Sequence, residues 1–169
     1  ADDAGDAVGA HIAFDGAGNA LAVWVQNDGT RLNTRANRFS ADTGWGTAQT
    51  IEADDSGRAL QPALAVDTSG NALAVWHRID GTRADVLANR FTPENGWGTA
   101  ETIYSDNAGD AAVSQIAVDR AGNAIAVWEQ DDGSSPKNIR ANRFTPDNGW
   151  GTAQTIESDN AGEASAAKI

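Results

Sequence analysis

Arginine and tryptophan side chains recur at regular intervals along this chain of 169 residues. An aromatic ring can lie against the apolar face of a sugar, and a guanidinium group carries five hydrogen-bond donors for hydroxyl groups. Weak equivalent sites that repeat along a chain gain strength by acting together. The same residues also suit packing, with tryptophan in the core and arginine tying one repeat to the next. The predicted ligand-binding residues are Trp45, Trp97, Trp150, Arg38, Arg90 and Arg143.

Acidic side chains form a second recurring set, in the loops between the repeats. The chain holds 24 Asp and Glu against 12 Lys and Arg, a net charge of −12. We expect more than half of these acids to lie on one face, because loops that join equivalent strands share an end of the sheet. Calcium takes six to eight oxygen ligands, although solvated turn residues would give the same composition. The predicted metal ligands are Asp54, Asp55, Asp106 and Asp110, with calcium as the metal.

Catalysis requires one unique constellation of side chains, so it should involve residues that break the repeat. His77 and Glu129 take the same place in successive repeats, where the first repeat has Val25, which indicates tolerated variation. The sequence has no Ser-His-Asp set, glycine-rich phosphate loop or zinc spacing. We therefore expect a protein that is not an enzyme. The residues that break the repeat are His11, His77, Arg78, Tyr104, Glu129 and Lys137.

Composition limits the remaining classes of function. The chain has no cysteine, which excludes disulfides and thiolate metal sites, and 40% hydrophobic residues, which favours a globular domain. The negative charge argues against nucleic acid and anionic membranes as partners. A start at Ala1 without any methionine resembles a mature, processed product, so we expect a secreted or cell-surface protein.

The elements that position these residues follow from an internal repeat. The string "GNALAVW" stands at 18–24 and 70–76 and returns as "GNAIAVW" at 122–128. Each unit of about 50 residues carries four short strand signals separated by Asp-Gly, Asn-Gly and Asp-x-x-Gly-Asn turns. No segment has helical periodicity. Four antiparallel strands per unit predict an all-β fold, a β-propeller with three four-stranded blades per chain.

The predicted blades cover residues 12–63, 64–115 and 116–167 of a single repeat domain, 1–169. Segments 1–11 and 158–169 resemble each other and form duplicated boundaries. Propellers close with four to eight blades, so three blades predict a homodimer that closes a six-bladed ring, or a fragment of a longer repeat array. A β-trefoil, which also has three units of four strands, is the alternative fold.

One unit reads "PALAVDTSGNALAVW" (62–76), then a strand that ends "NRF", then "GWGTAETI" (96–103), which is "GWGTAQTI" in the other two units. This pattern resembles the repeats of bacterial sialidase-like (BNR-type) β-propellers and covers nearly the whole chain. The Asp-box of that family is partly matched by "SADTGWG" and "TPENGWG". The family's arginine triad, acidic pair and tyrosine nucleophile are not matched, since Tyr104 is the only tyrosine. The resemblance implies the fold and a lectin-like role in place of catalysis.

The sequence thus predicts a non-catalytic, extracellular, carbohydrate-binding propeller with equivalent sites on its blades and glycans as partners. The alternative is a structural or adhesive repeat module, or an excised propeller fragment of a surface protein, without a small-molecule ligand.

Overall fold

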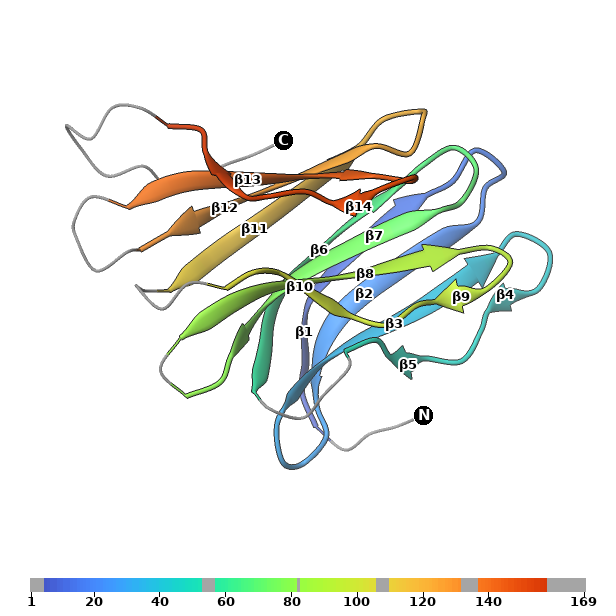
Figure 1. The fold of residues 1–169 in the computed structure, drawn as a ribbon. Helices are drawn as coiled ribbons and strands as arrows, with labels where there is room; N and C mark the ends of the chain where they lie inside the picture. The colour runs from blue at the N-terminus through green and yellow to red at the C-terminus, as the bar shows by residue number, and fades with distance from the viewer. Residues whose placement is uncertain (1–4, 53–56, 82, 106–109, 132–136, 158–169) are drawn as a thin grey trace.

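The computed structural model describes residues 5–52, 57–81, 83–105, 110–131 and 137–157, and these residues form strands and no helix. They build three separate antiparallel sheets, one from each repeat (Figure 1). Apart from one isolated parallel bridge between Ala84 and Asp110, the described strands pair within their own repeat, which favours the predicted propeller-type arrangement over the β-trefoil. We call the sheets 1, 2 and 3 in chain order.

Sheet 1 has the strand order β1-β2-β3-β4, and β5 also pairs with β3. The fourth strand predicted for each repeat is therefore split into two short pieces on the same edge. Between the pieces the backbone of Gly46 donates to the carbonyl of Arg38 (2.8 Å) and holds the chain against β3. The strands are β1 (Ala7–Phe14), β2 (Ala20–Asn27), β3 (Leu32–Ser40), β4 (Gly44–Trp45) and β5 (Gln49–Thr50).

Sheets 2 and 3 repeat this pattern. Sheet 2 has the order β10-β8-β7-β6 with β9 on β8, and sheet 3 has the order β11-β12-β13-β14 with β15 on β13. The strands of sheet 2 are β6 (Arg58–Val66), β7 (Ala72–Ile79), β8 (Ala84–Thr92), β9 (Gly96–Trp97) and β10 (Glu101–Tyr104). Those of sheet 3 are β11 (Ala111–Val118), β12 (Ala124–Gln130), β13 (Asn138–Thr145), β14 (Gly149–Trp150) and β15 (Gln154–Thr155).

The first strand of every sheet contains an irregularity at the same place. The register shifts between Val8 and His11 in β1, with equivalent shifts in β6 and β11. A bulge breaks the alternation of side chains, so the first half of each strand lacks a clear pattern. The sheets therefore begin several residues earlier than the predicted repeats at 12, 64 and 116. The duplicated segment 158–169 lies outside the described residues.

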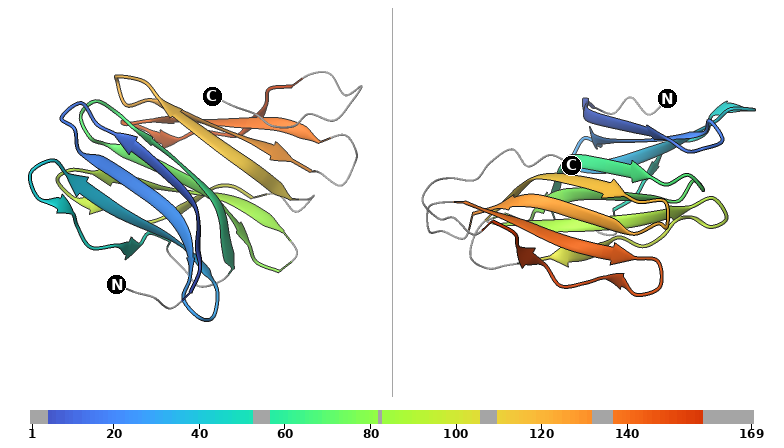
Figure 2. Two further views of the ribbon diagram at one scale, coloured as in Figure 1. Left: turned by 180° about the vertical axis from the view of Figure 1, so that it is seen from behind. Right: turned by 90° about the horizontal axis from the view of Figure 1, so that it is seen from above.

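Sheet 2 lies between sheets 1 and 3, as Figure 2 shows from above. Its central strand β7 is buried on both faces, so Trp76 is 0% exposed and packs among residues of sheet 1 such as Val23 and Ile51. Trp128 packs in the same way against sheet 2. Trp24 has no sheet on its side and is only partly buried. The recurring "GNALAVW" strand is thus built to be covered on both faces.

Sheets 1 and 3 each leave one face uncovered. The outer face of sheet 1 carries Ile12, Phe14, Ala22, Trp24, Arg35, Asn37, Phe39 and Trp45, which share one side through their cross-strand pairs. The outer face of sheet 3 carries Ile125, Val127, Ile139, Ala141, Arg143 and Ile156.

Candidate functional site

A rigid aspartate turn joins the first two strands of every sheet. In sheet 1, Asp15 Oδ1 accepts from the backbone of Ala17 (2.8 Å) and Asn19 (2.9 Å), and Oδ2 accepts from Asn19 Nδ2 (2.8 Å). Asp67 and Asp119 make the same three bonds in sheets 2 and 3. The turns therefore present a carboxylate and an amide at fixed, equivalent positions.

The three predicted arginines lie beside these turns. The guanidinium of Arg38 lies over the ring of Phe91 in the next sheet (5.9 Å), and Arg90 lies over Phe144 (5.5 Å). Each of these two arginines therefore reaches from its own sheet to the following one, as the packing alternative predicted. Cation–π contacts of this kind stabilise by about 0.5–2 kcal/mol.

A nearby arginine also affects the ionisation of the turn aspartate in sheet 3. The side-chain hydrogen bond from Asn123, then backbone hydrogen bonds and the charge of Arg143, hold the pKa of Asp119 below its usual value against the opposing effect of desolvation. An ionised carboxylate in this turn therefore lies near the guanidinium group of Arg143, which is on β13.

A pocket of about 220 Å³ opens where the turn of sheet 2 meets the turn of sheet 3. Its polar lining includes Asp67, Ser69, Arg90 and Arg120, and Phe144 supplies an aromatic side. Two arginines and one carboxylate thus converge on a single hollow between two sheets. We call this hollow the second-interface pocket.

The equivalent hollow between sheets 1 and 2 is lined by Asp15, Asn19, Arg38 and Phe91 but holds only about 10 Å³. The first pair of turns meets closely at position 16. Gly16 N donates to Thr68 O (3.3 Å), and a Cβ on Gly16 would lie 2.9 Å from that oxygen. The equivalent residue of sheet 2 is Thr68, which carries the Cβ that Gly16 lacks.

The third equivalent hollow lies on the outer face of sheet 3. It has about 460 Å³ and is lined by Asp119, Asn123, Arg143, Ile125 and Ile156. The structure thus places Arg38, Arg90 and Arg143 in three hollows that share one plan. The repeated Asp-x-x-Gly-Asn motif predicted these aspartates only as turn residues, and their place beside the arginines followed from the fold.

The predicted tryptophans lie behind the arginines. Each packs edge-on against the phenylalanine of its own sheet with ring centroids 5.5 Å apart. Trp97 and Trp150 are partly buried against the clusters between sheets, whereas Trp45, on the outer face of sheet 1, is 52% exposed. None of the three lines the described hollows. Their role in ligand binding stays a prediction.

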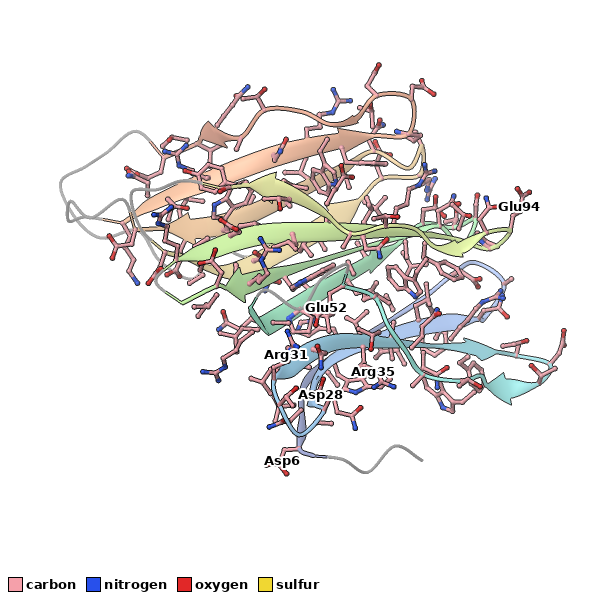
Figure 3. All side chains as sticks on the ribbon, turned by 60° about the horizontal axis from the view of Figure 1, so that its bottom comes forward. Asp6, Asp28, Arg31, Arg35, Glu52 and Glu94 are labelled. Carbon is pink, nitrogen blue, oxygen red and sulfur yellow. The ribbon has the colours of Figure 1, made fainter. Side chains whose placement is uncertain are left out.

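The acidic loops lie at the opposite end of the sheets. The backbone of Asp131 donates to Asp110 O (2.9 Å). The residue before the first strand of sheet 3 and the residue after its second strand are therefore neighbours at this end. Asp28 closes its own turn, and bonds from Thr30, Arg31 and Asn33 hold its pKa far below the usual value. Figure 3 shows Asp28 near Arg31 and Glu52 at this end of sheet 1.

Asp54, Asp55 and Asp106, three of the predicted calcium ligands, fall outside the described residues. Within the described ranges no group of three or more His, Asp or Glu side chains is arranged to hold a metal ion. Calcium binding stays a prediction.

Residues that break the repeat meet between sheets 2 and 3. His77 Nε2 lies 2.6 Å from Ser114 Oγ, and burial lowers the pKa of His77 to about 4. Tyr104 packs on Trp128 (5.2 Å), and Arg140 lies over the Tyr104 ring (5.0 Å). These side chains join sheets 2 and 3. The sequence did not reveal their contacts, because the partners lie far apart along the chain.

Other members of this set form ion pairs. Arg78 pairs with Asp85 at 3.0 Å, and Lys137 lies 3.8 Å from Glu129.

The part of the chain that the structure describes has no helix long and apolar enough to span a membrane.

No protein-family model matches the sequence, and no curated protein is similar to it. The structure, however, is similar to solved structures. A Hadza microbial sialidase superposes with a TM-score of 0.63 at 13% identity, over 88% of this chain and 37% of its own. A protein of unknown function from Dyadobacter fermentans gives 0.56 at 13% identity, over 77% and 35%.

The intramolecular trans-sialidase from Ruminococcus gnavus gives 0.51 at 16% identity, over 82% and 32%. At these identities the likeness shows the fold alone, which is sialidase-like, as the resemblance implied. The chain spans about a third of the length of these structures.

Proposed function

We propose that this protein is a non-catalytic, extracellular, lectin-like β-propeller that binds carbohydrate between its blades. The observation that carries the proposal is the second-interface pocket, where Arg90, Arg120 and Asp67 converge between two sheets. Arg90 and Asp67 have equivalents at the other hollows, Arg38 with Asp15 and Arg143 with Asp119, whereas Arg120 belongs to this pocket alone among the three.

The chemistry of this pocket suits hydroxyl groups. Guanidinium groups only donate and an ionised carboxylate only accepts, whereas a sugar hydroxyl does both. Binding pockets usually hold about 300–1,000 Å³, so a pocket of about 220 Å³ favours one sugar ring over an oligosaccharide. The arginines would supply the contacts, and the tryptophans would hold the phenylalanines in place.

The sialidase-like fold supports a carbohydrate-related role, since two of the similar structures are named sialidases. The non-catalytic part of the proposal is supported by the packing roles of residues that break the repeat, such as His77 and Tyr104. We also propose that the protein is secreted.

A structural or adhesive module is the second candidate. It is favoured by the position of Arg38 and Arg90 over phenylalanines of the next sheet, since these contacts stabilise the fold without any ligand. In that case the hollows would be a by-product of how the turns pack.

A glycan array on the chain, run with calcium and with a chelator, separates the two candidates. Binding that Arg120→Ala weakens at least about tenfold, or ~1.4 kcal/mol, would support the lectin, because Arg120 is exposed and lines the pocket. Arg58→Ala is the matched control, since Arg58 is exposed at the other end of sheet 2. Absence of glycan binding under both conditions would favour the structural module.

A further inference from the structure

Five of the six large exposed apolar side chains among the described residues lie on the two uncovered faces, and Val8 is the sixth. Ile12, Phe14 and Trp45 lie on the outer face of sheet 1, and Ile125 and Ile156 on that of sheet 3. Equivalent residues of the repeat show that a covering sheet is missing from sheet 3. Ile51 is 3% exposed and Ile103 is 8% exposed, whereas the equivalent Ile156 is 58% exposed. Contiguous apolar surface of this kind usually marks an interaction site.

The two internal interfaces show what would cover these faces. At both, an asparagine of the later sheet donates to a backbone carbonyl of the earlier one. Asn89 Nδ2 lies 2.7 Å from Ile51 O, and Asn142 Nδ2 lies 3.1 Å from Ile103 O. At both, an arginine of the earlier sheet lies over a phenylalanine of the later one. Sheets therefore pack through one contact plan, used twice.

The outer faces carry the two halves of the same plan. On sheet 3, Arg143 takes the position of Arg90, and Ile156 takes that of Ile103 with its carbonyl. On sheet 1, Phe39 takes the position of Phe144, and Asn37 takes that of Asn142. Asn37 Nδ2 donates to Gly46 O within its own sheet (3.1 Å), as Asn142 does to Gly151 O. The bond to an earlier sheet is the one that Asn37 lacks among the described residues.

The charges at one end of the two faces are also complementary. At the second interface Tyr104 meets Arg140. In the repeat, Glu157 takes the place of Tyr104 on sheet 3, and Arg35 takes the place of Arg140 on sheet 1. The carboxylate oxygens of Glu157 are buried within the chain and have no hydrogen-bond partner among the described residues. A face of sheet 3 against a face of sheet 1 would bring this acid to an arginine.

We propose that the outer face of sheet 3 docks on the outer face of sheet 1 of a second copy of this chain. The second copy docks back in the same way, so that two chains close one ring of six sheets. Arg143 then lies over Phe39 of the second copy, and Asn37 of the second copy donates to Ile156 O. Glu157 pairs with Arg35.

A face-to-face dimer through sheet 3 is the competing arrangement. It would leave the outer face of sheet 1 uncovered, with its Ile12, Phe14 and Trp45 exposed. The head-to-tail arrangement covers both faces and places unlike charges together. Complementary charge sets the register of an interface and opposes wrong partners.

Docking also completes the third arginine hollow. Arg143 and Asp119 line it from one side only, whereas Arg90 and Asp67 face the turn and phenylalanine of a following sheet. The second copy would supply Phe39 and the turn at Gly18. That this completed hollow binds a sugar rests on the proposed function, but the docking itself does not.

The first test is the molar mass of the chain in solution, by light scattering on a gel-filtration column across a range of concentrations. We expect twice the chain mass of 17.5 kDa. Glu157→Arg and Arg35→Glu should each raise the dissociation constant at least about tenfold, and the double variant should restore most of the loss. Glu94→Arg is the control, because Glu94 is exposed in a turn of sheet 2 away from both faces (Figure 3).

Ile156→Asp gives a second readout, since Ile156 is already exposed in one chain and its replacement should not unfold it. We expect a folded monomer with a cooperative melt. A monomeric unmodified chain, a larger ring, or a charge exchange that fails to restore the dimer would each overturn the proposal. A dimer without glycan binding would retain the docking and remove the proposed function, and glycan binding by a monomer would do the reverse.

Discussion

The side-chain amide of Asn89 lies 2.7 Å from the carbonyl oxygen of Ile51, so that one sheet is hydrogen-bonded to the last strand segment of the sheet before it. The same Nδ2 also donates to Gly98 O (3.1 Å) within its own sheet. One side chain thereby fixes the split fourth strand of its own sheet and the spacing to its neighbour. Asn142 does the same one repeat later.

Replacement of Asn89 should therefore weaken the interface between sheets 1 and 2. We expect Asn89→Ala to lower the free energy of unfolding by about 1–3 kcal/mol, because it leaves buried carbonyl groups without a donor. Urea denaturation measures the loss. Asn95→Ala is the control, since the side chain of Asn95 bonds only to nearby Thr92 and is exposed. Equal losses in the two variants would contradict a role between sheets.

Because the turns of sheets 1 and 2 approach closely, a side chain added at Gly70 should destabilise the fold. Gly70 has φ +84°, and a Cβ there would lie 3.1 Å from Asp15 Oδ2 and 3.2 Å from Pro93 Cγ. Gly96 has φ +73° and open space around it. Both alanine variants bear the cost of a left-handed backbone, about 1–2 kcal/mol. Gly70→Ala should cost about 1–3 kcal/mol more through crowding, measured by thermal or urea denaturation of the pair.

The buried His77 predicts a pH dependence of stability. Burial lowers its pKa from 6.5 to about 4, so the unfolded chain binds a proton at a pH where the folded chain does not. The contribution of His77 to stability is therefore constant above pH 6.5 and falls as the pH decreases toward 4, by roughly 3 kcal/mol.

His77→Gln should flatten this part of the curve and can keep a hydrogen bond to Ser114. His11→Gln is the control, because His11 is exposed. Urea denaturation at several pH values between 4 and 7 measures the slope, and an unchanged slope in His77→Gln would assign it to other groups.

The size of the second-interface pocket should depend on one side chain. Thr68→Gly copies the glycine that lets the first pair of turns meet, so we expect the pocket of about 220 Å³ to shrink toward the 10 Å³ of the first interface. A crystal structure of the variant measures the volume, and glycan binding should fall at least about tenfold, ~1.4 kcal/mol. A pocket of unchanged volume would assign the difference to residues other than Thr68.

Local patterns were sufficient to predict the strands and their grouping. The repeat, the alternation of Leu21 and Val23 with small alanines, and the Asp-x-x-Gly-Asn turns depend on contacts within about 25 residues, and each recurs three times. The bulges in β1, β6 and β11 escaped notice because an irregular strand has no period to read.

The site depended on contacts between repeats, which no local pattern records. Arg38, Arg90 and Arg143 are equivalent in the sequence. In the fold their surroundings differ, because Arg38 and Arg90 each lie over a phenylalanine of the following sheet, whereas Arg143 lies on the outer face of sheet 3. The fold also brought Gly16 against the carbonyl oxygen of Thr68, 52 residues away in the chain, and left a hollow of about 10 Å³ at the first interface and about 220 Å³ at the second. Volume and exposure belong to the packing of whole sheets, so only the tertiary structure could decide them.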